Sequence, residues 1–174
     1  MKIEVKNIKV NLAFSEETTC YKADVFVNGV KTAYAENDGH GGCTNIQPYP
    51  NKGTVLATAY AHAKTLPSIE SSFGGKPLEM DLELFVDLAI DDYVNAKEKA
   101  KFEKKIAKAM IYDIVFGVPN SGSVRRIGYG KTPLARVVMT NRPQVQALLD
   151  RIRKEHCKDG VEILNTNLAE LGLK

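Results

Sequence analysis

Apolar and polar positions alternate over most of the first 36 residues, the pattern of strands that bury one face. The alternation over residues 2–14 shifts phase near Asn7, which predicts a β-bulge. A second alternating segment covers residues 18–27, and Asn28-Gly29 follows it as a strong signal for a tight hairpin turn. A third strand is expected over residues 30–36. Together these segments predict a three-stranded antiparallel meander with one covered face.

The middle of the chain has the 3.6-residue periodicity of a long helix. Apolar spacing begins near Met80 and continues to an apolar end at residues 111–116, either as one helix or as two helices broken near Asn95. Acidic residues are enriched at its start and lysines in its distal part, as the helix dipole favours. A short alanine-rich helix is expected earlier, over residues 54–65.

Prolines and glycines mark the connections. Loops are predicted at residues 46–53 and 67–77, and a flexible or hairpin-like connection is predicted at residues 117–131. The C-terminal part then predicts a strand at 134–139, a helix capped by Thr140 or Asn141 with Pro143 in its first turn, and a short strand at 161–164.

The predicted elements describe a single α+β domain over residues 1–174. It consists of an N-terminal three-stranded antiparallel sheet, a long central helix and a C-terminal strand-helix-strand that is compatible with addition to the first sheet.

The composition is that of an ordinary soluble globular protein, with 44% hydrophobic and 26% charged residues. The sequence contains no apolar run of about 18 residues, so we expect no membrane-spanning helix. The N-terminus lacks the apolar segment of a signal peptide. Three scattered cysteines favour reduced thiols over a disulfide framework. We therefore expect a cytoplasmic protein without a membrane partner.

The net charge of +3 hides a strong asymmetry. Residues 1–96 carry 8 Lys/Arg and 13 Asp/Glu, whereas residues 97–158 carry 15 Lys/Arg and 5 Asp/Glu. The balance is therefore −5 in the first segment and +10 in the second, and the remaining residues contribute −2. This pattern indicates an anionic partner or two halves that attract each other, with a solvated lysine-rich helix face as the alternative.

A glycine-rich turn follows the third predicted strand. Its candidate ligand residues are Asp38, Gly39, His40, Gly41, Gly42 and Cys43. The favoured interpretation is a structural turn in which Asn37 or Asp38 bonds nearby backbone. The alternatives are anion capture by backbone N–H groups, and a metal or thiol site built on Asp38, His40 and Cys43, with His62 or His156 as further ligands. The spacing matches no known metal motif, so no metal ion, cofactor or catalytic residue is assigned.

A second candidate lies at residues 122–133, where three cations and a tyrosine occur without an acidic residue. Arginine offers forked donors to phosphate, and a tyrosine ring offers a surface for a base. The segment is not a Walker A loop, because Arg125 stands where a glycine is required. The candidate nucleic-acid-binding or anion-binding residues are Arg125, Arg126, Tyr129, Lys131, Arg136, Lys104 and Lys105. An exposed basic hairpin without a ligand is the alternative.

A third candidate is acidic. Asp87 and Asp91 are four residues apart and share one face of the long helix, where paired carboxylates could hold Mg²⁺. The acidic start of a helix also follows from the dipole alone, and we favour that explanation.

The opening part of the chain resembles small uncharacterised proteins encoded by bacterial phages and mobile elements. The residues that carry the resemblance are Tyr34-Ala35-Glu36, the following residues 37–43, and the Ser15-Glu16-Glu17-Thr18 turn. Such proteins include inhibitors of host defence, among them anti-CRISPR proteins. The resemblance implies a role of that class and fixes no catalytic residue.

We therefore expect a non-catalytic binding protein whose basic segment engages nucleic acid or a nucleic-acid-bound host protein, as an inhibitor of a host nuclease would. One alternative is a small metal- or thiol-dependent phosphoesterase that uses the glycine-rich turn. Another is a protein that sequesters an anionic nucleotide through the N–H groups of that turn.

Overall fold

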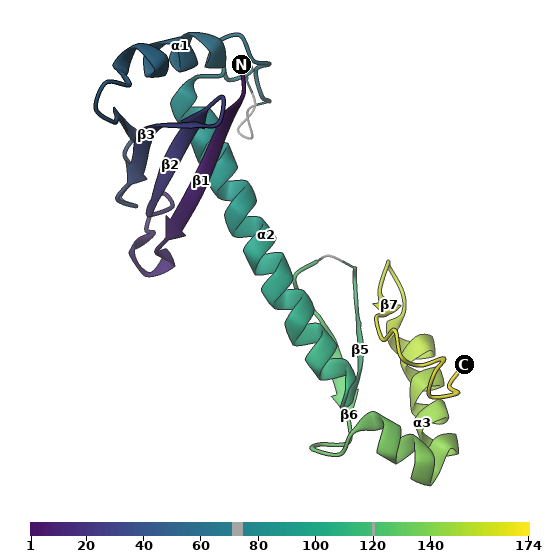
Figure 1. The fold of residues 1–174 in the computed structure, drawn as a ribbon. Coiled ribbons are helices and arrows are strands. Elements are labelled where there is room, and N and C mark those ends of the chain that lie inside the picture. Colours follow the sequence, from purple (N-terminus) through teal and green to yellow (C-terminus); the bar gives the residue numbers. More distant parts are fainter. Residues whose placement is uncertain (71–74, 120) are drawn as a thin grey trace. The chain divides into compact units, whose positions relative to one another are not determined.

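The computed structural model describes residues 1–70, 75–119 and 121–174 (Figure 1). Their contacts divide into two compact units, Met1–Ala96 (unit 1) and Lys97–Lys174 (unit 2). The division coincides with the change of charge along the chain, because unit 1 has a net charge of −5 while unit 2 carries 16 Lys/Arg and 8 Asp/Glu, a net charge of +8. The predicted α+β class is confirmed.

Unit 1 contains a four-stranded antiparallel sheet in the order β1-β2-β3-β4. Its strands are β1 (Ile3–Val10), β2 (Tyr21–Val27), β3 (Val30–Asn37) and β4 (Asn45–Pro48). The prediction of three strands was therefore incomplete, since β4 occupies the start of the expected loop. A four-residue edge strand ending in proline gives little sequence signal, and an edge strand tolerates Pro48 because one side of it needs no hydrogen-bonded partner.

The local features predicted for the first three strands are confirmed. The β1–β2 register shifts between Lys6 and Lys9, and Asn7 between them has a φ of 54°, which identifies a bulge. Asn28 and Gly29 join β2 to β3 with φ values of 49° and 80°. Positive φ at both positions is the requirement of a type I′ hairpin turn.

Two helices bury their apolar stripes against one face of this sheet. These are α1 (Gly53–Ala63) and the first part of α2 (Leu82–Met110), while η1 (Leu12–Phe14) is a short 3-10 turn after β1. The core contains Ala23 and Val25 from β2, Leu56 from α1, and Leu82 and Val86 from α2. Both predicted helices are confirmed, and α2 continues without a break at Asn95. The predicted loop at 67–77 includes residues 71–74, which lie outside the described residues.

Unit 2 contains its own antiparallel sheet in the order β6-β5-β7. The strands are β5 (Asp113–Gly117), β6 (Arg125–Gly128) and β7 (Glu162–Ile163). The expectation that residues 111–116 end the long helix was wrong, because α2 ends at Met110 and β5 follows. A short, continuously apolar run has no periodicity that separates a buried strand from a helix. The hairpin-like connection at 117–131 contains β6, and residue 120 within it lies outside the described residues.

Helix α3 (Leu134–His156) covers one face of this second sheet. The predicted strand at 134–139 was wrong, because these residues form the first turns of α3 and bury Leu134 and Val138 at helical spacing. Asn141 interrupts the helix with a φ of −152° and accepts a hydrogen bond from the Gln144 N–H at 3.3 Å, which confirms the predicted cap. The C-terminal strand-helix-strand joined to the first sheet is therefore replaced by a separate sheet with its own helix. No helix in the described ranges is both long and apolar enough to cross a membrane.

Candidate functional site

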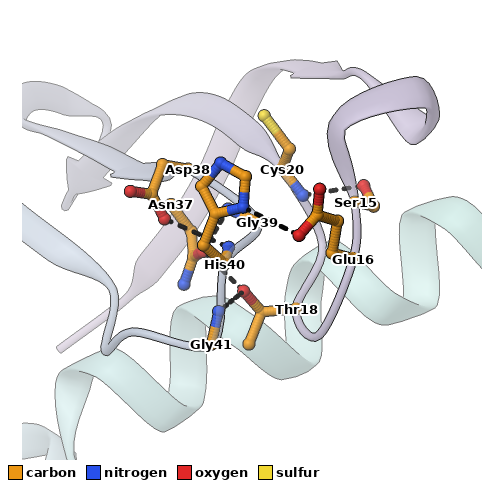
Figure 2. Close-up of polar contacts among 9 residues, drawn as sticks. All are labelled: Ser15, Glu16, Thr18, Cys20, Asn37, Asp38, Gly39, His40 and Gly41. Atoms are coloured by element: carbon orange, nitrogen blue, oxygen red, sulfur yellow. Dashed lines mark hydrogen bonds and ion pairs between the residues drawn. The ribbon is translucent and has the colours of Figure 1, made fainter.

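The glycine-rich turn packs against the loop that precedes β2, and Asn37 connects the two (Figure 2). The Asn37 Oδ1 accepts hydrogen bonds from the Thr18 hydroxyl at 2.7 Å and the Gly39 N–H at 2.9 Å, and its Nδ2 donates to the Gly42 carbonyl. The Gly39 carbonyl accepts from three successive N–H groups, those of residues 16–18, at 3.0 to 3.3 Å. The predicted local bonding by Asn37 is confirmed, and it closes the turn onto its neighbour.

Two glycines of this turn are required by close approach and backbone conformation. Gly39 has a φ of +91°, and a Cβ there would lie 2.1 Å from the Phe14 carbonyl oxygen. Gly41 has a φ of +89°, and a Cβ there would lie 2.2 Å from a Glu17 carboxylate oxygen. The glycine pattern therefore follows from packing between two loops and needs no ligand to explain it.

The three chemically active side chains of the turn do not form one cluster. The His40 Nδ1 lies 3.2 Å from a Glu16 carboxylate oxygen (Figure 2). Asp38 accepts a hydrogen bond from the His40 backbone N–H at 3.2 Å, and Cys43 is an exposed free thiol. Within the described ranges, no three His, Cys, Asp or Glu side chains lie close enough together to share a metal ion.

The N–H groups of this turn are used within the protein. The Gly39 and His40 N–H groups donate to the Asn37 and Asp38 side chains, and the Gly41 N–H donates to the Thr18 hydroxyl at 3.3 Å. These three donors are therefore occupied and do not point toward an open anion site. The remaining predicted ligand, Gly42, accepts the Asn37 amide through its carbonyl.

A cleft of about 440 Å³ lies beside the same loops in unit 1. Its lining includes the carboxylates of Glu16, Glu17, Asp87 and Asp91. Burial, followed by the neighbouring Asp87 and Asp92 charges, raises the pKa of Asp91 above its usual value. This cleft is negatively charged at neutral pH and repels phosphate groups.

Most of the acidic residues at the start of α2 have structural partners. Asp81 accepts the Leu84 N–H at 2.8 Å as a helix cap, and Glu83 accepts the Tyr60 hydroxyl at 2.8 Å. Asp87 accepts hydrogen bonds from Thr44 at 2.5 Å and from Tyr21 at 3.0 Å. These bonds tie α2 to the sheet and to α1.

Unit 2 contains a basic groove of about 520 Å³ between the end of α2 and the β5–β6 hairpin. We define the basic groove by its lining residues, which are Lys105, Lys108, Ala109, Tyr112, Asp113, Arg126 and Gly130. Its charged side chains are two lysines from α2, one arginine from β6 and the Asp113 carboxylate. Neither lysine is paired with a carboxylate in the described part of the chain.

Arg126 is positioned from the opposite strand. Its Nη1 lies 3.6 Å from an Asp113 carboxylate oxygen, while 68% of its side chain stays exposed. Asp113 and Gly128 are cross-strand partners, and a Cβ on Gly128 would lie 2.0 Å from the Asp113 Oδ1. The glycine thus leaves space for the carboxylate that restrains Arg126.

The structure brings only part of the predicted basic set into this groove. Lys105 and Arg126 line it. Arg125 is the strand neighbour of Arg126, and adjacent strand residues point to opposite faces of a sheet. The other predicted residues, which do not line the groove, are Lys104, Tyr129, Lys131 and Arg136.

The predicted aromatic platform also has a different position. Tyr129 is half-buried against the core of unit 2, and this burial raises the pKa of its hydroxyl. Tyr112 is 39% exposed and lines the groove instead. Tyr112 and Lys108 were not among the predicted binding residues, and Tyr112 had been assigned to the helix with residues 111–116. Recognising β5 would have placed Tyr112 at the turn beside the basic strand.

His156, considered as a further metal ligand, has a structural position. Its ring stacks on the buried Phe116 with 5.3 Å between ring centroids and an interplanar angle of 20°. His62 lies in the last turn of α1.

Comparison of the chain with models of protein families, with curated proteins and with solved structures finds no match.

Proposed function

We propose that this protein binds nucleic acid without chemical conversion, through the basic groove of unit 2. The observation that carries the proposal is the convergence of Lys105, Lys108 and Arg126 on one hollow. Phosphate contacts by lysine and arginine supply most of the affinity of sequence-independent nucleic-acid binding. Arginine adds a forked donor pair that suits phosphate oxygens.

The electrostatics of unit 2 support an anionic partner. The unit has a net charge of +8, whereas unit 1 has a net charge of −5 and an acidic cleft. Cations that line a hollow concentrate their field there and attract a polyanion from a distance. This charge distribution supports a phosphate-binding surface in unit 2 rather than in unit 1.

The lining of the groove favours binding over catalysis. The described residues that line it include no His, Cys, Ser or Thr. Its single carboxylate, Asp113, already pairs with Arg126. Among groups that act as nucleophile or general base, the described lining offers the Tyr112 hydroxyl and the lysine ammonium groups, and it has no imidazole or unpaired carboxylate to activate them.

The proposal is tested with fluorescence anisotropy on a labelled DNA or RNA of about 20 nucleotides, titrated with the full chain at several salt concentrations. We expect binding at low salt that weakens steeply as salt rises. The double variant Lys105→Ala/Arg126→Ala should bind more weakly and should reduce the slope of log affinity against log salt by about 2, since each phosphate contact contributes about 1.

The matched control is Lys9→Ala/Lys64→Ala, which removes two exposed positive charges from unit 1. It should leave both the affinity and the salt slope unchanged. Absence of binding by the unaltered protein at low salt would overturn the proposal, as would an equal loss in the control.

The proposal extends to nucleic acid held by a host nuclease. It is supported by the resemblance of residues 15–18 and 34–43 to small phage and mobile-element proteins. A protein that occupies exposed nucleic acid in such a complex blocks access to it. In a cleavage assay, the unaltered protein should slow the nuclease and Lys105→Ala/Arg126→Ala should not.

A further inference from the structure

Tyr112 places an aromatic ring in the wall of the basic groove. It follows the last turn of α2, where its backbone N–H donates to the Ala109 carbonyl at 3.0 Å. The side chain is among the exposed large hydrophobic groups of the protein. Its hydroxyl makes no hydrogen bond with other described residues. The backbone of Tyr112 is therefore fixed at the end of α2, while 39% of the residue is exposed beside the groove.

An exposed ring among cations is a suitable surface for a nucleobase. Every base has a flat π-face, so stacking on tyrosine tolerates any sequence. Lys105 and Lys108 are three residues apart on α2 and therefore project from one helix face. The ring and the two ammonium groups offer one contact for a base and two for the phosphates that flank it.

We propose that the basic groove takes single-stranded nucleic acid, with a base on Tyr112 and neighbouring phosphates on Lys105 and Lys108. This inference rests on the proposed function and narrows its ligand. In a duplex, both faces of each base are covered by its neighbours, so Tyr112 finds no free face unless a base leaves the stack. A hollow of about 520 Å³ is in the size range of small-ligand pockets and suits a nucleotide unit.

The experiment compares one labelled strand of about 12 nucleotides, as DNA and as RNA, alone and annealed to its complement. The full chain should bind the single strand more tightly than the duplex. Tyr112→Ala should weaken single-strand binding by about 5-fold to 150-fold, the range measured for loss of a base–aromatic stack. Tyr112→Phe should bind like the unaltered protein, because stacking needs the ring and not the hydroxyl.

The matched control is Ile111→Ala. Ile111 is the neighbouring exposed residue and does not line the groove. It should leave binding unchanged. A general disturbance of the α2–β5 turn would instead weaken binding in both alanine variants and would overturn the assignment to Tyr112.

Tyrosine fluorescence provides a second readout that a merely structural role would not change. The chain has 7 Tyr and 0 Trp, so its intrinsic emission comes from tyrosine. A base stacked on Tyr112 should quench part of that emission. Tyr112→Phe should abolish this part of the quenching while retaining the affinity.

The possible failures are distinguishable. If Tyr112→Ala binds single strands as well as the unaltered protein while Lys105→Ala/Arg126→Ala does not, the stacking inference is wrong and the proposed function stands. Preference for the duplex, or equal losses in Tyr112→Phe and Tyr112→Ala, also overturns the inference. If no strand binds at low salt, both proposals are wrong.

Discussion

Gly39 shows how a single missing Cβ sets the shape of the glycine-rich turn. Its φ of +91° and its close approach to the Phe14 carbonyl leave no room for a side chain. We expect Gly39→Ala to lower the free energy of unfolding by about 2 to 4 kcal/mol, since strain and steric conflict add. Urea denaturation followed by circular dichroism measures this loss.

Gly42 in the same turn is the matched control. A Cβ there would meet nothing within 4 Å, so Gly42→Ala should change stability by less than about 0.5 kcal/mol. Equal effects of the two substitutions would contradict the close-approach explanation.

Asp24 on β2 predicts a pH dependence of stability. Burial opposes its ionisation, but hydrogen bonds from Asn7 and Tyr49, both at 2.7 Å, and the Lys31 ammonium at 2.9 Å outweigh burial and lower its pKa. A carboxylate with a lowered pKa stabilises the folded state above its unfolded pKa of about 3.9. That contribution disappears as the pH falls through the folded pKa.

The prediction is therefore a stability difference between the unaltered protein and Asp24→Asn that is present near neutral pH and shrinks below about pH 4. Urea midpoints measured across this range test it. Glu79→Gln, a change at an exposed carboxyl in the same unit, is the control and should show no comparable trend. A difference that grows on acidification would contradict the prediction.

At the scale of single residues, the sequence predicts those features that depend on residues adjacent in the chain. Asn28-Gly29 and Asn37 act through their own backbone and their nearest neighbours, so the hairpin and the Asx bonding were predictable. The positions of Tyr112 and Tyr129 depend on which residues pair across β5 and β6. The pairing of β5 with β6 is a tertiary property, and the local pattern of apolar and polar residues does not predict it.

At the scale of elements, the errors fall where packing overrides local preference. Residues 134–139 are rich in valine and leucine and have strand character, but burial of Leu134 and Val138 at a spacing of four residues favours a helix. The cap at Asn141 was predictable because capping depends on side-chain chemistry within one turn. Strand β7 has two residues and exists through its pairing with β5.

On the side of β5 that pairs with β7, the Asn165 side chain continues the hydrogen bonding of the strand. The Asn165 Oδ1 accepts the Val115 N–H at 2.6 Å, and its Nδ2 donates to the Asp113 carbonyl at 3.0 Å. We expect Asn165→Ala to destabilise unit 2 by about 1 to 3 kcal/mol, because it leaves two part-buried backbone groups unsatisfied. Amide hydrogen exchange at Val115 should become faster.

Thr166→Ala, a change at the exposed neighbour, should leave that exchange rate unaltered. If the Val115 amide stays protected from exchange in Asn165→Ala, then other groups accept its hydrogen bond and the prediction is wrong.

At the scale of the whole molecule, charge is the property that the sequence predicts best. The change of sign near residue 96 coincides with the boundary between the two compact units. Charge is a sum over residues and needs no knowledge of pairing. The position of the basic groove cannot be predicted without knowing which elements pack together, because α2 and β6 supply its cations from positions about 20 residues apart in the chain.

In the proposed complex with nucleic acid, the Asp113–Arg126 pair has a consequence for how the strand leaves. An arriving phosphate competes with a carboxylate that is already beside the guanidinium, so Arg126 exchanges one anion for another. The Asp113 side chain is only 15% exposed, so the carboxylate stays beside Arg126 while the guanidinium remains accessible. In the proposed complex, Asp113 would therefore compete with each phosphate for Arg126, and we expect this competition to shorten the residence time of the phosphate.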